Sequence, residues 1–132
     1  MAPGPVMAAG LISARGGDIA VEPKVKLWIE KAGLLVLSDY RVQLLQHVAD
    51  TGSLAQAAER MGLSYRRAWG KIKEIERNLG VRLVQSEVGG VGGGRTRLTP
   101  QGQLLLVQYR RFRTAVEADV GREFVRAFGE RP

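Results

Sequence analysis

Residues 53–79 read SLAQAAERMGLSYRRAWGKIKEIERNL, and this stretch decides the fold. Ser53, with Gln56 three residues later, has the pattern of a capping box, which starts a helix. Gly62 ends this helix after about two turns, and Ser64 is the natural N-cap of a longer one. Two helices joined by a tight turn that contains glycine are typical of a helix-turn-helix motif.

Apolar side chains recur at helical spacing in both helices and mark the faces that pack together. The stripe of the first helix contains Leu54, Ala57, Ala58 and Met61, and that of the second contains Ala68, Ile72, Ile75 and Leu79. Ala57 and Ala58 let the two helices lie close together, because larger side chains would force them apart. The stripes predict a compact helical hairpin with a shared apolar core.

The start of the second helix carries the candidate DNA contacts, because this end of a recognition helix meets base edges. Arg66 and Arg67 can read guanine O6 and N7 or hold a phosphate, and both assignments stay open. Tyr65 is expected either to contact a phosphate or thymine methyl or to pack against the wing, and Trp69 to lie in the core or an interface. The predicted DNA contacts of the two helices are Ser53, at the start of the first, and Ser64, Tyr65, Arg66, Arg67 and Lys71, in the second.

A glycine-rich stretch, GGVGGGRTRLT at 89–99, raises the question of a nucleotide-binding P-loop. Gly89, Gly94, Arg95 and Thr96 almost match the spacing G-x-x-x-x-G-K-[ST]. A P-loop, however, needs a helix that starts at its Lys-Ser/Thr pair, and here a strand and a proline are expected to follow. The lysine is also replaced by arginine, which is a planar fork rather than a compact charge. The stretch therefore does not favour a P-loop.

The same stretch fits a wing, which is a β-hairpin whose slim loop follows the DNA backbone. Residues 81–88 and 95–98 are the expected strands, and glycine lets the loop approach phosphates closely. Arg95 and Arg97 can pair with phosphates or enter a minor groove. The predicted wing glycines are Gly89, Gly90, Gly92, Gly93 and Gly94.

Further elements are expected on the N-terminal side of this core. Apolar and polar residues alternate in VKLWIEKAGLLVLS at 25–38, which predicts a β-hairpin with a Lys-Ala-Gly turn. Asp39 is expected to cap a helix that runs to about residue 50. Residues 1–23, rich in alanine, glycine and proline, are interpreted as a flexible tail, and residues 24–99 as the DNA-binding domain.

Thr99 and Pro100 predict the start of a long C-terminal helix, within residues 100–132, that extends to about residue 128. At 1.5 Å per residue it would span about 43 Å, more than a domain of this size can cover, so a second copy of the chain is expected to cover the rest. The alternative is a helix that breaks near Gly121 and folds back. The predicted dimerisation residues are Leu105, Tyr109, Phe112, Val116, Val120 and Phe124.

Composition narrows the function classes. The 132 residues suit one domain, and the absence of cysteine together with a single histidine excludes disulfides and multi-histidine metal sites within one chain. The net charge is +7, and residues 64–97 carry eight cations against three carboxylates, which is +5 of that total. Such an excess of positive charge indicates a polyanionic partner.

No apolar run reaches the roughly 18 residues of a membrane span, and no signal peptide is expected. The protein is therefore expected in the cytoplasm without a membrane partner.

The segments GSLAQAAERMGLSYRRAWGKIKEIERNLG and LVQSEVGGVGGGRTRLTPQGQLLL together resemble the N-terminal DNA-binding domain of the ModE family, the molybdate-responsive transcription regulators. A broader likeness to LysR-type regulators follows the same stretch, and the resemblance covers about residues 25–128. It implies a winged helix-turn-helix fold, mainly α with small β, and a long dimerisation helix. A homodimer would then read a roughly palindromic operator in double-stranded DNA.

Family members carry molybdate-binding domains after this helix, where the chain ends at Pro132. We therefore expect no cofactor in this chain and only an indirect molybdate response.

The sequence favours a sequence-specific regulator over two other classes of protein. An enzyme is disfavoured, because the sequence has no nucleophile elbow, no zinc-ligand spacing and no convincing carboxylate pair. A protein-interaction module that kept the fold without DNA binding is argued against by Arg66, Arg67 and the glycine wing. A basic protein that binds DNA without sequence preference stays a further alternative.

Overall fold

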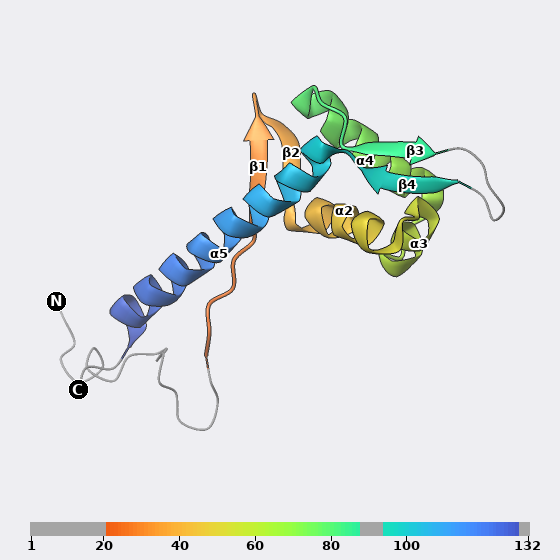
Figure 1. The fold of residues 1–132 in the computed structure, drawn as a ribbon. Coiled ribbons are helices and arrows are strands. Elements are labelled where there is room, and N and C mark those ends of the chain that lie inside the picture. Colours follow the sequence, from red (N-terminus) through yellow and green to blue (C-terminus); the bar gives the residue numbers. More distant parts are fainter. Residues whose placement is uncertain (1–20, 88–93, 130–132) are drawn as a thin grey trace, which may run out of the picture. The chain divides into compact units, whose positions relative to one another are not determined.

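The computed structural model describes residues 21–87 and 94–129. The elements in chain order are β1 (Trp28–Lys31), β2 (Leu34–Ser38), α2 (Asp39–Thr51), α3 (Leu54–Arg60), α4 (Tyr65–Leu79), β3 (Val84–Glu87), β4 (Arg95–Leu98) and α5 (Pro100–Phe128) (Figure 1). The expectation of a mainly α fold with two small antiparallel hairpins is confirmed. The contacts divide the chain into two compact units, Lys26–Arg111 and a second that includes residues 21–25 and 112–129, so α5 contributes to both.

The helix-turn-helix motif forms as its capping residues predict. The Ser53 hydroxyl accepts a hydrogen bond from the backbone N–H of Gln56 at 3.1 Å, and that of Ser64 accepts one from Arg67 N–H, also at 3.1 Å. The capping box is only half formed, because the Ser53 N–H donates to the Thr51 hydroxyl at 3.1 Å rather than to the Gln56 side chain. Both helix starts in the sequence prediction are therefore confirmed.

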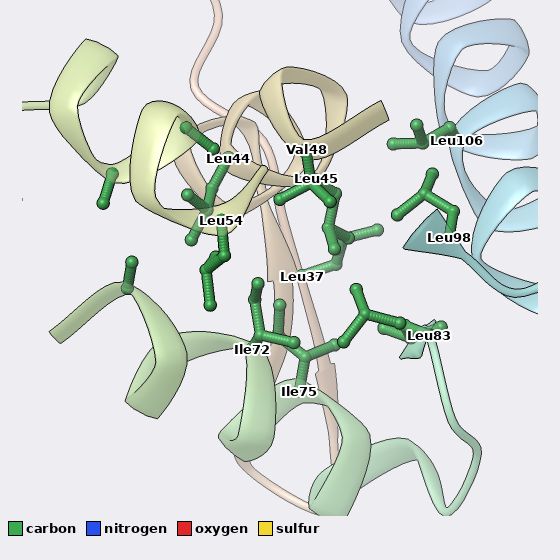
Figure 2. Close-up of a cluster of buried hydrophobic side chains, with 14 of the residues drawn as sticks. Leu37, Leu44, Leu45, Val48, Leu54, Ile72, Ile75, Leu83, Leu98 and Leu106 are labelled. Carbon is green, nitrogen blue, oxygen red and sulfur yellow. The ribbon is translucent and has the colours of Figure 1, made fainter. Parts of the chain in front are cut away.

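The core of Lys26–Arg111 gathers apolar side chains from all the helices of this unit and from both hairpins. Figure 2 shows ten of them converging, namely Leu37, Leu44, Leu45, Val48, Leu54, Ile72, Ile75, Leu83, Leu98 and Leu106. Ala57 and Ala58 of α3 and Ala68 of α4 are also buried here, at 0–2% exposure. The small side chains thus allow the close packing of α3 against α4 that the sequence predicted.

The N-terminal hairpin differs from the prediction in two respects. β1 and β2 pair antiparallel around a turn at Ala32 and Gly33, but all four residues of β1 are exposed, and the predicted alternation is seen only before the strand, where Val25 and Leu27 are half-buried. A two-stranded ribbon has no neighbour to cover its outer side. Ser38, not Asp39, caps α2, because the Ser38 hydroxyl accepts the N–H of Arg41 at 3.2 Å.

The wing hairpin is anchored to the turn before α3. β3 and β4 pair from Val84 opposite Leu98 to Glu87 opposite Arg95. The N–H of Thr96 donates to the carbonyl of Gly52 at 3.0 Å, which ties β4 to the turn before α3.

Thr99 caps α5, as expected. Its hydroxyl accepts the N–H of Gly102 at 3.0 Å and donates to the carbonyl of Arg82 at 2.6 Å. The start of α5 therefore lies against the start of the wing. α5 continues as one helix from Pro100 to Phe128, so the alternative break near Gly121 is wrong.

One predicted dimerisation residue is buried in its own domain, and a second is half-buried there. Tyr109 is only 4% exposed and belongs to the core, where its hydroxyl donates to the carboxylate of Asp39, while Leu105 packs partly buried against that core. The first turns of α5 thus cover their own domain, and the long apolar stripe does not serve one purpose throughout. Phe112 remains 48% exposed.

In the second unit the middle of α5 contacts the segment before the hairpin. The Arg113 guanidinium donates to the carbonyl of Val25 at 3.0 Å, and Lys24 pairs with Glu22 at 2.9 Å. No helix in residues 21–87 and 94–129 is long and apolar enough to cross a membrane.

Candidate nucleic-acid interface

The first turn of α4 carries exposed arginines that form no ion pair with the described residues. Tyr65, Arg66 and Arg67 are all exposed, and Tyr65 is 57% exposed. In the described part of the chain no carboxylate forms an ion pair with Arg66 or Arg67. Ser64 already accepts the N–H of Arg67, which fixes this turn, so the two guanidinium groups remain available to an acceptor outside the protein.

The exposed face of α4 continues beyond this turn. Ala68, Ile72 and Ile75 are buried, and helical spacing puts Arg66, Gly70 and Arg77 on the opposite side, where all three are exposed. The apolar side of such a helix can pack on the core, while its cationic side can face a polyanion.

Lys71 lies on the flank of this face. Its ammonium group stands 5.5 Å from the centre of the Tyr40 ring of α2, an arrangement typical of a cation–π contact. On the other flank the Lys73 ammonium lies 4.6 Å from the ring centre of Trp69 and 3.2 Å from the Glu76 carboxylate. Both lysines thus have partners within the protein, and Lys71 is less available to DNA than the first-turn arginines.

A groove of about 400 Å³ connects α3, α4 and the wing. It brings together three of the predicted DNA contacts, Ser53, Tyr65 and Arg95. The rest of its lining is Leu54, Ala55, Ser86, Glu87, Gly94 and Thr96. The capping hydroxyl of Ser53 accepts the N–H of Gln56, and its own proton is left to donate to a phosphate.

The wing carries one paired and one unpaired arginine. Arg97 pairs with Glu87 across the strands at 3.1 Å, whereas Arg95 is exposed and forms no ion pair with any described residue. A Cβ at Gly94 would lie 2.8 Å from the carbonyl oxygen of Glu87, so the close strands require glycine there. Gly89, Gly90, Gly92 and Gly93 lie outside the described residues.

A buried carboxylate joins α4, the candidate recognition helix, to the wing. Glu76, 8% exposed, accepts the backbone N–H groups of Leu83 at 2.7 Å and Val84 at 3.2 Å. Burial acts to raise the pKa of Glu76, but these two N–H groups and the Lys73 ammonium outweigh it and hold the pKa below its usual value. In the sequence Glu76 counts only as one of the three carboxylates in residues 64–97, and its place beside the apolar stripe of α4 is the signal that could have identified it.

A second ion pair holds α4 against α2. Arg41, which is 8% exposed, donates to the Glu74 carboxylate at 2.7 Å, and this guanidinium lowers the pKa of Glu74. No pattern in the sequence indicates that an arginine in α2 is buried. Glu74 and Glu76 therefore stabilise the position of α4 from its two flanks, while the first-turn arginines stay free.

Comparison with known proteins agrees with this geometry. Residues 40–103 match the model of the bacterial regulatory helix-turn-helix proteins of the lysR family. The solved CbnR DBD–DNA complex superposes with a TM-score of 0.52 and 25% identity, covering 66% of this chain and 94% of that one. The structure of Vibrio fischeri DarR in complex with DNA has a TM-score of 0.52 at 21% identity, over 68% of this chain and 30% of that one, and shows the shared fold alone.

Residues 40–103 therefore form a winged helix-turn-helix domain of the LysR type. The chain is also similar to the DNA-binding transcriptional dual regulator ModE of Escherichia coli K12, with 35% identity over 67% of this chain and 34% of ModE. It is 38% identical to the molybdenum-pterin-binding protein MopB of Rhodobacter capsulatus, over 62% of this chain and 29% of MopB. The resemblance to ModE-like regulators is thus confirmed, and the chain spans about a third of the length of these relatives.

Proposed function

We propose that the chain is a transcription regulator that binds double-stranded DNA sequence-specifically as a homodimer in the cytoplasm. The observation that carries the proposal is the first turn of α4, where Arg66 and Arg67 are exposed and without an ion pair in the described part of the chain. Tyr65, the residue before them, lines a groove together with two further predicted contacts, Ser53 and Arg95. Among the described residues no group of acidic or histidine side chains is placed to hold a metal ion.

The proposed binding mode assigns each element a role. The first turn of α4 enters the major groove, where Arg66 or Arg67 donates two hydrogen bonds to guanine O6 and N7. Ser53 donates to a phosphate, and Arg95 on the wing pairs with a phosphate or enters the adjacent minor groove. Tyr65, which lines the groove between α4 and the wing, contacts the DNA backbone or a thymine methyl.

The homodimer follows from the apolar side chains that α5 leaves exposed. Leu104, Val107, Phe112, Val125 and Phe128 are each 45–55% exposed. A second copy of α5 is the proposed cover, and two recognition helices related by a two-fold axis would read half-sites about 34 Å apart or a small multiple of that. The operator would then be roughly palindromic.

The regulated genes are proposed from the names of the relatives. ModE of Azotobacter vinelandii is named a molybdenum transport protein, and it is 38% identical over 56% of this chain. We propose that this chain regulates genes of molybdate transport or of molybdenum enzymes. We further propose that any molybdate response reaches it indirectly, so that adding molybdate leaves the DNA affinity of the purified chain unchanged.

Fluorescence anisotropy tests the DNA-binding proposal. The purified protein is titrated with duplexes from the region upstream of its own gene and with a scrambled competitor, at low and moderate salt. The double variant Arg66→Ala, Arg67→Ala should lose the preference for the specific duplex, at roughly 1–3 kcal/mol for each base contact removed. Equal affinity for both duplexes in the wild type would favour a non-specific basic protein, and no binding even at low salt would favour a protein-interaction module.

A further inference from the structure

Gly70 stands in the middle of the recognition helix. α4 begins and ends with well-suited residues, Ser64 as its N-cap and Gly80 in the left-handed conformation as its C-cap. Glycine inside a helix, by contrast, is the least favourable residue after proline, because it loses the most backbone freedom on folding. The helix therefore contains one position that lowers its own stability.

The fold accounts for the other described glycines of Lys26–Arg111 but not for Gly70. Four of them have φ between +67° and +79°, a region that favours glycine, namely Gly33, Gly52, Gly62 and Gly80. At Gly94 and Gly102 a Cβ would lie 2.8 Å and 2.3 Å from a backbone oxygen. Gly70 has no positive φ, and a Cβ built on it meets nothing within 4 Å. The protein's own packing would therefore accept alanine at this position.

The position of Gly70 on α4 supplies a reason outside the protein. Gly70 follows Arg66 by one turn on the exposed face, opposite the buried Ala68 and Ile72. An α-helix with its side chains is about 10–12 Å wide and the major groove is about 12 Å wide, so the fit is tight. A side chain in the middle of the outward face then limits how deeply the helix can enter.

We propose that Gly70 is a specificity-determining position at which the bare backbone of α4 comes closest to the base edges. The missing side chain brings Arg66 and Arg67 within hydrogen-bonding distance of the bases, whereas a larger residue would hold the helix away and leave only phosphate contacts. This inference rests on the proposed DNA-binding function and adds a steric requirement to it.

The test compares Gly70→Ala and Gly70→Leu with Gly121→Ala, a matched control in α5 whose Cβ also meets nothing within 4 Å. The wild-type protein first selects a duplex from a randomised pool, and anisotropy then gives the affinity of each variant for this duplex and for a scrambled one. Both alanine variants should melt a few degrees higher than the wild type, because alanine favours helix. Gly70→Ala should bind the selected duplex about tenfold more weakly, Gly70→Leu more weakly still, and both should bind the scrambled duplex as the wild type does.

Two results can be told apart. If Gly70→Ala binds the selected duplex within about twofold of the wild type, the steric role of Gly70 is overturned while the DNA-binding function stands. If the wild type enriches no sequence from the pool, the proposed function itself fails. Gly121→Ala should keep wild-type affinity for both duplexes, and an equal loss in this control would also overturn the role of Gly70.

Discussion

At the residue scale, the carboxylate of Glu76 shows how the recognition helix and the wing are held together. One side chain accepts the N–H groups of both Leu83 and Val84 and pairs with the Lys73 ammonium. Charge-assisted hydrogen bonds of this kind are stronger than neutral ones, and leaving buried N–H groups without an acceptor is costly. Glu76 therefore stabilises the position of the wing through contacts within the chain alone.

Replacing Glu76 tests this role. Glu76→Gln should lower the free energy of unfolding at pH 7 by about 1–3 kcal/mol, because the charge that both N–H groups contact is removed. Glu59→Gln, on the exposed surface of α3, is the control and should change it by less than about 0.5 kcal/mol. Urea denaturation gives both values, and equal values for the two variants would contradict the assigned role.

The same residue predicts a pH dependence. The folded state lowers the pKa of Glu76, and that of Glu74 beside Arg41, so the ionised forms stabilise the fold. This stabilisation is fully present above the pKa of the unfolded chain and is lost as the pH falls through the lower folded pKa. The difference between the wild type and Glu76→Gln should therefore be constant near neutral pH and shrink in acid. A difference that grows as the pH falls would contradict the direction of the shift.

At the scale of elements, the junction between the wing and α5 depends on backbone proximity. A Cβ at Gly102 would lie 2.3 Å from the carbonyl oxygen of Leu83 and 3.3 Å from the Leu98 side chain. Gly102→Ala should therefore force the start of α5 away from the wing and lower the free energy of unfolding by roughly 1–3 kcal/mol. Thermal melting measures this, with Gly121→Ala as the open control, and an unchanged midpoint for Gly102→Ala would show that the junction is not tight.

The wing itself contains a carboxylate, Glu87, whose charge would repel a phosphate of the proposed DNA partner. Glu87 lines the groove with Arg95 and pairs with Arg97, and both side chains of the pair are largely exposed, at 43% and 60%. An exposed pair of this kind contributes little to stability, so Glu87→Gln should leave the melting midpoint nearly unchanged. It should tighten binding to the selected and the scrambled duplex alike and steepen the salt dependence, since Arg97 becomes free for a phosphate. Weaker binding would instead show that Glu87 orients Arg97 for DNA.

The elements were predictable from the sequence where local chemistry determines them. Ser53, Ser64 and Thr99 cap helices in the structure as their neighbours indicate, and the glycine-rich stretch separates two paired strands. The sequence could not show that Arg41 would be buried, because its partner Glu74 lies 33 residues away along the chain. For Glu76 the only sign was its place beside the apolar stripe of α4, and its partners Leu83 and Val84 lie beyond the end of that helix. Tyr109 was predicted to lie in the dimer interface. Helical periodicity identifies the apolar face of α5, but it does not show which part of that face packs on the chain's own domain and which part on a second copy.

At the scale of the whole molecule, the exposed apolar side chains of α5 predict a dimer. Phe112→Glu should shift the protein from dimer towards monomer in sedimentation velocity, because a charge in an apolar interface is strongly unfavourable. Leu34→Glu is the control, since Leu34 is 57% exposed on the N-terminal hairpin and should leave the dimer intact. A wild type that sediments as a monomer at micromolar concentration would contradict the dimer.

Hydroxyl-radical footprinting on a duplex selected by the wild-type protein tests the central claim most directly. It shows which nucleotides the recognition helix and the wing protect, and whether the protected tracts are related by a two-fold axis. The account predicts two protected tracts related by a two-fold axis and separated by about 34 Å, roughly one helical turn, or a small multiple of it. Both tracts should disappear in the Arg66→Ala, Arg67→Ala variant. Uniform protection along the duplex, or a pattern that the double variant leaves unchanged, would contradict sequence-specific binding through the first turn of α4.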